Sequence, residues 1–180
     1  ESKNEVLELE RLAKNKKRIV NLGIRLNPNT DAKTLSKIST GKKEDKFGVS
    51  EKKFLELVKY AKKSKYINLE CLSVHIGSQI LSHTPYEKML KVVDRIIRKS
   101  NYKFKFVDLG GGMGIPYNKK SKSLNYKKYL YAIKKILNKY KTKIHTLFHF
   151  GEFSRIYQSF ESLDDCLETN SISSNSVFKF

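Results

Sequence analysis

Segments with the pattern of a buried strand alternate with segments with the pattern of a helix along most of this 180-residue chain. Strand then helix, at about forty residues per unit, predicts a parallel sheet with helical crossovers. Such a sheet either closes into a barrel or stays open and doubly wound. Strands are expected at 18–28, 67–77, 103–111 and 143–151, and helices at 2–14, 51–64, 84–100 and 125–140.

The repeat stops near the carboxyl end. Residues 1–160 contain no stretch with the composition of a linker and are predicted to form one domain. Residues 161–180 turn acidic and then rich in Ser and Asn, so a disordered tail is expected there. No window is apolar for long enough to span a membrane.

The net charge of +19 raises nucleic acid as a partner, because clustered cations gain affinity by releasing counterions from phosphates. Here nearly all the cations are Lys, and they are spread along the whole chain. This distribution is typical of lysines on a solvated surface, so nucleic-acid binding is kept only as an alternative. Cys71 and Cys166 lie far apart without a CxxC or His pairing. Neither a disulfide framework nor a metal site is therefore expected, and a reducing cytoplasm is the expected location.

In a parallel α/β fold the ligand lies at the carboxyl ends of the strands. The expected strands here end in Asn27-Pro28, "HIGSQ" at 75–79, "GGGMG" at 110–114 and "FGEFSR" at 150–155. Three consecutive glycines let backbone N–H groups converge on an anion, although a tight turn without a ligand is the alternative. The spacing fits neither a dinucleotide fingerprint nor a nucleoside-triphosphate loop. A smaller phosphate-bearing cofactor is therefore predicted.

Two polar residues lie at the carboxyl end of the second expected strand. His75 is either an ordinary hydrogen-bonded residue at a strand end or a group for ring stacking or proton transfer. Ser78 would donate a hydrogen bond to a phosphate oxygen from the same loop.

Three segments together resemble the diaminopimelate decarboxylase family: "IRLNPNTDAKTLSKISTGKKEDKFGV", "LSVHIGSQI" and "VDLGGGMGIPY". The resemblance runs from about Asn21 to Tyr117 and less clearly to Arg155. It implies an alanine-racemase-like (β/α)₈ barrel, of which this chain holds about four units. It also implies pyridoxal 5′-phosphate as cofactor, a homodimer, and a carboxy-lyase that converts meso-2,6-diaminopimelate to L-lysine in lysine biosynthesis. A related arginine or ornithine decarboxylase of the same fold is the runner-up.

The resemblance also implies roles for single residues. His75 would stack on the pyridine ring, Ser78 would support the phosphate, and Gly110, Gly111 and Gly112 would present N–H groups to that phosphate. Lys46 in "DKFG" matches a lysine near the dimer contact, with an exposed loop lysine as the alternative.

The fourth strand end departs from the family. Where the family has Glu-Pro-Gly-Arg, this chain has "EFSR". Glu152 would pair with the pyridine nitrogen, and Arg155 would bind the phosphate or the substrate carboxylate. Phe153 and Ser154 replace Pro and Gly, which should weaken this part of the cradle.

Two parts of the family pattern have no counterpart in the chain. Nothing resembles the early Tyr-Ala-x-Lys-Ala strand whose Lys forms the Schiff base, and the carboxyl-terminal β-domain with its Cys-Glu-Ser segment is missing. We therefore expect an internal fragment that is catalytically inactive as an isolated chain.

Overall fold

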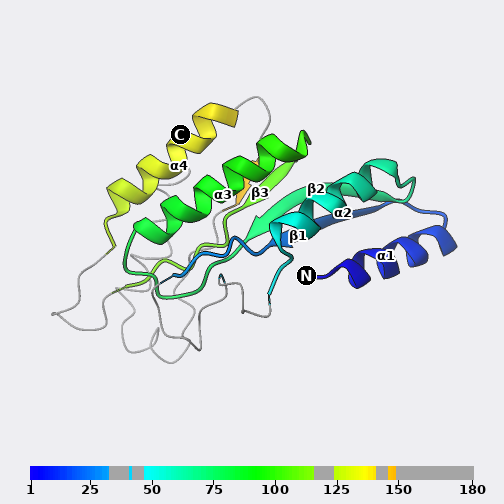
Figure 1. Ribbon diagram of the computed structural model, residues 1–180, viewed down its shortest axis with the longest axis horizontal. Coiled ribbons are helices and arrows are strands. Elements are labelled where there is room, and N and C mark those ends of the chain that lie inside the picture. Colours follow the sequence, from blue (N-terminus) through cyan, green and yellow to red (C-terminus); the bar gives the residue numbers. More distant parts are fainter. Residues whose placement is uncertain (33–40, 42–46, 116–123, 141–145, 149–180) are drawn as a thin grey trace.

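A computed structural model describes residues 1–32, 41, 47–115, 124–140 and 146–148 (Figure 1). In this part of the chain, helices and strands alternate as the sequence predicts. The order is α1 (Lys3–Asn15), β1 (Val20–Leu26), α2 (Glu51–Lys63), β2 (Ile67–Val74), α3 (Thr84–Ser100), β3 (Phe106–Asp108), α4 (Tyr126–Tyr140) and β4 (Thr146–Phe148).

The strands of the described residues form one parallel sheet in the order β1-β2-β3-β4. Each strand therefore lies beside the strand that precedes it in the sequence. An open doubly wound sheet reverses its strand order at one point, whereas a barrel wall keeps the sequential order. The sheet is therefore a section of barrel wall, which confirms one of the two folds that the repeat predicts.

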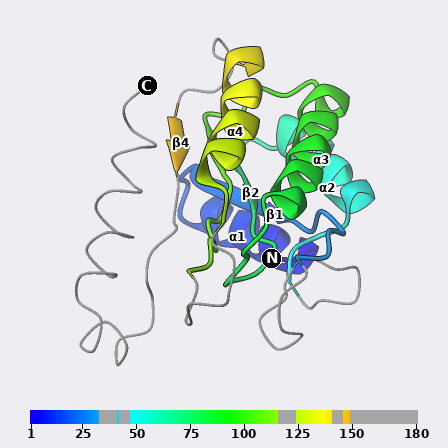
Figure 2. The same cartoon turned by 90° about the vertical axis from the view of Figure 1, so that its left-hand side faces the viewer.

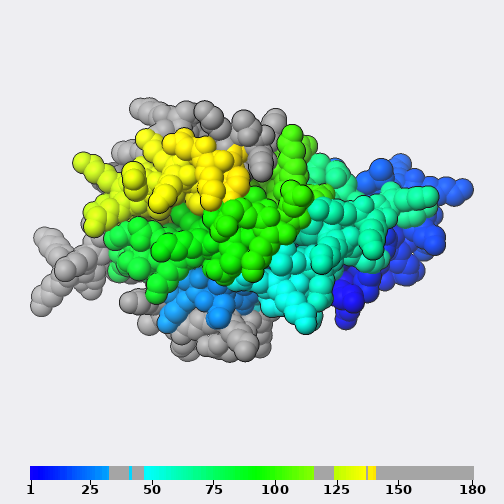
Figure 3. All heavy atoms as spheres, turned by 45° about the horizontal axis from the view of Figure 1, so that its top comes forward, coloured from blue at the N-terminus to red at the C-terminus, as the bar shows by residue number. Residues whose placement is uncertain are grey.

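Helices α2, α3 and α4 lie side by side and cover one face of the sheet (Figure 1). The 90° view shows α3 and α4 next to each other (Figure 2). In the space-filling view the same three helices follow one another as a continuous outer surface (Figure 3). The predicted helix starts are confirmed, because the Ser50 hydroxyl accepts from the Lys53 N–H and Pro85 lies in the first turn of α3.

The core lies between these helices and the sheet. Alternate residues of a strand point to opposite faces, and on one face they are apolar and buried. The helix-facing side chains include Ile24, Leu72, Val74 and Val107, each at most 3 % exposed. The other face carries polar side chains, and it is this face that forms the site described below.

Several predicted features lie outside the described residues. They are Lys46, Cys166, the segment with Glu152 and Arg155, and the tail at 161–180. Among the described helices none is long and apolar enough to cross a membrane.

Candidate active site

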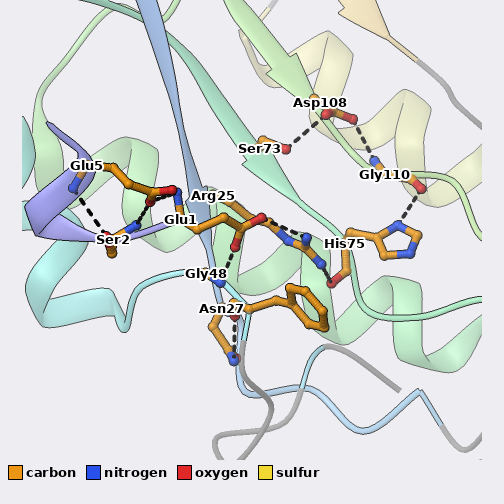
Figure 4. Close-up of polar contacts among 11 residues, drawn as sticks. Glu1, Ser2, Glu5, Arg25, Asn27, Gly48, Ser73, His75, Asp108 and Gly110 are labelled. Atoms are coloured by element: carbon orange, nitrogen blue, oxygen red, sulfur yellow. Dashed lines mark hydrogen bonds and ion pairs between the residues drawn. The ribbon is translucent and has the colours of Figure 1, made fainter. Parts of the chain in front are cut away.

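A cavity of about 530 Å³ opens on the polar face of the sheet, toward the carboxyl ends of the strands (Figure 4). Every second residue of a strand faces it, as a period of two requires. The lining residues come from three neighbouring strands, the turns after them and the amino terminus: Gly23, Arg25, Cys71, Ser73, His75, Asp108, Gly110 and Glu1.

The turn after β3 consists of three consecutive glycines with positive φ angles. Gly110, Gly111 and Gly112 have φ angles of 72°, 60° and 78°, a region that L side chains rarely adopt. A Cβ on Gly110 would lie 2.2 Å from the carbonyl oxygen of Val74, and one on Gly112 would lie 1.9 Å from that of Gly77. The turn therefore packs directly against the backbone at and after the end of β2, and only glycine fits at positions 110 and 112.

The three carbonyl groups of this turn are all held by hydrogen bonds to other parts of the fold. The donors come from the end of β2, the first turn of α3 and the loop between them. The pairs are His75 Nδ1 with Gly110 O at 2.6 Å, Tyr86 OH with Gly111 O at 3.1 Å, and Ile80 N with Gly112 O at 3.1 Å.

Of the three N–H groups of the turn, one donates a hydrogen bond within the described fold and two do not. The Gly110 N–H donates to the Asp108 carboxylate at 2.8 Å, so it is already engaged within the fold. Within the described residues, the N–H groups of Gly111 and Gly112 donate no hydrogen bond. The anion-binding prediction therefore rests on these two donors.

His75 is fixed in one tautomer by its contact with Gly110. A carbonyl oxygen only accepts, so Nδ1 carries the proton and Nε2 keeps its lone pair. Burial lowers the pKa of His75, while the hydrogen bond to Gly110 opposes that shift and Arg25 adds to it. The ring at the cavity is therefore a neutral imidazole at neutral pH.

The loop with Ser78 is tied to the loop that follows the glycine turn. The Gln79 side-chain amide donates to the Ile115 carbonyl at 2.7 Å and accepts from the Ile115 N–H at 3.2 Å. Ser78 is exposed between Gly77 and Gln79. The structure thus brings His75, Ser78 and the three glycines together at one end of the sheet.

Arg25 and Asp108 line the cavity although the sequence did not single them out. The Arg25 guanidinium lies 5.0 Å from the centre of the Phe47 ring and 3.5 Å from the His75 carbonyl oxygen. Asp108 accepts from the Ser73 hydroxyl at 2.9 Å (Figure 4). The period-two pattern contained the signal, because Arg25 lies two positions after Gly23 and Asp108 lies two positions before Gly110.

Comparisons with known proteins show the family to which the chain belongs. Residues 1–152 match the family described as pyridoxal-dependent decarboxylase, pyridoxal binding domain. The chain belongs to this family. One relative, the diaminopimelate decarboxylase of Campylobacter jejuni, is 38 % identical to this chain over 122 residues, which are 66 % of this chain. That of Methanocaldococcus jannaschii is 34 % identical over 149 residues, 80 % of this chain.

Solved structures of the family confirm the barrel fold. The diaminopimelate decarboxylase of Helicobacter pylori complexed with L-lysine has a TM-score of 0.72 at 36 % identity, covering 84 % of this chain and 38 % of its own. The M. jannaschii enzyme in co-complex with L-lysine has a TM-score of 0.66 at 32 % identity, covering 82 % of this chain and 36 % of its own. This chain spans 30 % and 34 % of the length of the C. jejuni and M. jannaschii relatives.

Proposed function

We propose that this chain supplies the phosphate cradle and the ring-stacking histidine of a pyridoxal-phosphate enzyme that decarboxylates meso-2,6-diaminopimelate to L-lysine. The observation that carries the proposal is the closure of the glycine turn on His75 at the carboxyl ends of β2 and β3. It joins a turn of bare backbone to an imidazole ring, and His75 and Gly110 line the same cavity. The substrate is proposed from the relatives that are at least 30 % identical, which are named diaminopimelate decarboxylases.

The described residues fit the phosphate of the cofactor. The turn excludes any Cβ at Gly110 and Gly112, and it leaves two neighbouring N–H donors, Gly111 and Gly112, for an anion. The exposed Ser78 hydroxyl lies in the adjoining loop. The Arg25 guanidinium lines the cavity together with Gly110, and there it forms an ion pair with the Glu1 carboxylate at 3.0 Å.

When bound, pyridoxal phosphate provides the electron sink that decarboxylation of an amino acid requires. In this chain, the neutral His75 ring offers a flat face without a charge that would compete for those electrons. With the proton on Nδ1, the Nε2 atom of His75 is a hydrogen-bond acceptor and not a donor. Glu152 as the partner of the ring nitrogen and Arg155 as a ligand for phosphate or carboxylate remain proposals from the family pattern, as does pairing of two copies near Lys46.

Cofactor binding is the experiment that tests the proposal. Because the chain holds 37 Lys and Arg residues, an aldehyde would react with many lysines, so the amine form, pyridoxamine 5′-phosphate, is the suitable probe. We expect saturable binding by calorimetry, with pyridoxamine and inorganic phosphate each binding at least about tenfold more weakly.

Two histidine variants supply the matched comparison. His75→Leu removes the ring that faces the cavity and should weaken binding of pyridoxamine 5′-phosphate about tenfold. His83→Leu changes the residue before α3, whose side chain makes no capping hydrogen bond and does not line the cavity, and should leave the affinity unchanged. Equal affinities for all three proteins, or binding of inorganic phosphate as tight as that of the cofactor amine, would contradict the proposal.

The substrate is tested separately in a chimera. Residues 1–152 replace the matching segment of the M. jannaschii relative, and carbon dioxide release is measured from diaminopimelate, arginine and ornithine. Release from diaminopimelate alone is expected, with its loss in the same chimera carrying His75→Leu. Release from arginine or ornithine instead would favour the runner-up activity.

A further inference from the structure

Tyr86 reaches the glycine turn from the helical layer. It lies in the first turn of α3, its side chain is fully buried, and its hydroxyl donates to the Gly111 carbonyl at 3.1 Å. The Tyr129 ring of α4 packs edge-on against it, with ring centres 4.7 Å apart and an angle of 71° between the planes. Two helices therefore hold this hydroxyl in place behind the turn.

Because the peptide bond is planar, this contact also fixes the direction of the N–H group of the next residue. A trans peptide is planar, so its C=O and the N–H of the next residue point in opposite directions. No cis peptide occurs among the described residues. Holding the Gly111 carbonyl toward Tyr86 therefore aims the Gly112 N–H away from the helices. By the same logic, holding the Gly110 carbonyl toward His75 sets the direction of the Gly111 N–H.

We propose that Tyr86 is a positioning residue, whose hydroxyl fixes the direction of the Gly112 N–H so that it can donate to the phosphate of the cofactor. The role toward the phosphate rests on the proposed function, whereas the orientation of the N–H does not. Burial raises the pKa of Tyr86 well above its ordinary value, so the hydroxyl keeps its proton and remains a donor throughout the physiological pH range.

The test variant is Tyr86→Phe, which removes one oxygen atom and keeps the buried ring. Its matched control is Tyr102→Phe, because the Tyr102 hydroxyl also donates to a backbone carbonyl, that of Leu69, at 2.8 Å. That carbonyl belongs to β2 rather than to the glycine turn. The two variants thus remove the same kind of hydrogen bond at and away from the proposed site.

The direction of the N–H groups is measured by residual dipolar couplings on the ligand-free full chain. We expect the coupling of the Gly112 N–H to change in Tyr86→Phe and to stay the same in Tyr102→Phe. An unchanged Gly112 coupling in Tyr86→Phe would overturn the proposal. If this variant does not fold, the carbonyl ¹³C shift of Gly111 in the unaltered chain decides. A shift typical of a hydrogen-bonded carbonyl supports the contact, and one typical of a free carbonyl refutes it.

The role toward the phosphate is measured by comparing two ligands. In Tyr86→Phe, binding of pyridoxamine 5′-phosphate should weaken about fivefold, the effect of one lost hydrogen bond, while binding of pyridoxamine stays constant. Equal weakening of both ligands would mean general loosening of the fold and would overturn the positioning role. If the unaltered chain bound neither ligand, the proposed function would fail, and the dipolar couplings would still decide on the orientation by Tyr86.

Discussion

The imidazole of His75 and the backbone carbonyl of Gly110 are joined by a contact of 2.6 Å between Nδ1 and the oxygen. This contact links the ends of two neighbouring strands, β2 and β3, at the mouth of the cavity. It fixes the tautomer of the histidine and at the same time the first carbonyl of the glycine turn. The imidazole ring and the glycine turn are therefore parts of one hydrogen-bonded unit, and a substitution in one should alter the conformation of the other.

His75 should titrate below its ordinary pKa of about 6.5, because burial disfavours the charged ring. With the folded-state pKa lowered, the unfolded chain takes up the proton first as the pH falls. The free energy of unfolding should therefore decrease as the pH falls from about 6.5 through the folded-state pKa, and should not depend on this group above that window. NMR titration of the ring measures the pKa. A value at or above 6.5 would refute the prediction, and His75→Gln should remove this component of the pH dependence.

Gly112→Ala should destabilise the fold by about 2–4 kcal/mol, because the new Cβ meets backbone and the residue keeps a positive φ. The Cβ would lie 1.9 Å from the Gly77 oxygen at a φ of 78°. Denaturant unfolding gives the free energy. Gly23→Ala is the control in the same cavity wall, since its Cβ would lie 3.0 Å from the Cys71 Cβ at an ordinary φ, and its effect should stay within about 1 kcal/mol. Equal effects of the two substitutions would show that the backbone contact and the positive φ at Gly112 are not the cause of the destabilisation.

Gln79→Glu should cost about 1–3 kcal/mol, because a carboxylate keeps the acceptor for the Ile115 N–H but places a second oxygen against the Ile115 carbonyl. Asn125→Asp makes the same chemical change where the side chain only accepts, from the Lys128 N–H at 3.0 Å. Asp serves as well as Asn at a helix start, so this control should not destabilise the chain. Thermal unfolding of both variants distinguishes them, and a stable Gln79→Glu would mean that the two loops are not tied by this amide.

Cys71 should react slowly with iodoacetamide at neutral pH. Burial, and then the charge of Asp108, raise its pKa to about 11, and only the thiolate is nucleophilic. Asp108→Asn should accelerate alkylation at a given pH. Glu70→Gln should do so less, because Glu70 has the smaller influence on this thiol. Mass spectrometry assigns the modified cysteine. Rapid alkylation of Cys71 in the unaltered chain would show that the thiol is not shielded as described.

The order of elements was predictable because each strand and helix has a strong local pattern. The barrel was distinguished from an open sheet only by the strand order, a long-range property. The third strand is shorter than the expected 103–111: it covers Phe106–Asp108, since the chain passes into positive φ at Gly110. The spacing of apolar residues in the sequence does not show where the pairing between strands ends.

The site was predictable only where it consists of a local motif. The glycine turn and His75 stand in short, recognisable segments, and the structure brings them together. Tyr86 was predicted only as part of a helix, because its pattern carries no sign that its hydroxyl meets a carbonyl 25 residues further along the chain. Arg25 and Asp108 likewise depend on strand register, which fixes which side of the sheet a residue faces.

An NMR titration of the ¹⁵N-labelled chain with pyridoxamine 5′-phosphate tests most directly whether the glycine turn binds the phosphate. We expect saturable downfield shifts of the Gly111 and Gly112 amide protons, with a smaller shift of the Gly110 amide because it already donates to Asp108. Pyridoxamine without the phosphate should leave the Gly111 and Gly112 signals in place. Shifts confined to lysine-rich surface segments, with both glycine amides unmoved, would contradict the claim that this turn is a phosphate cradle.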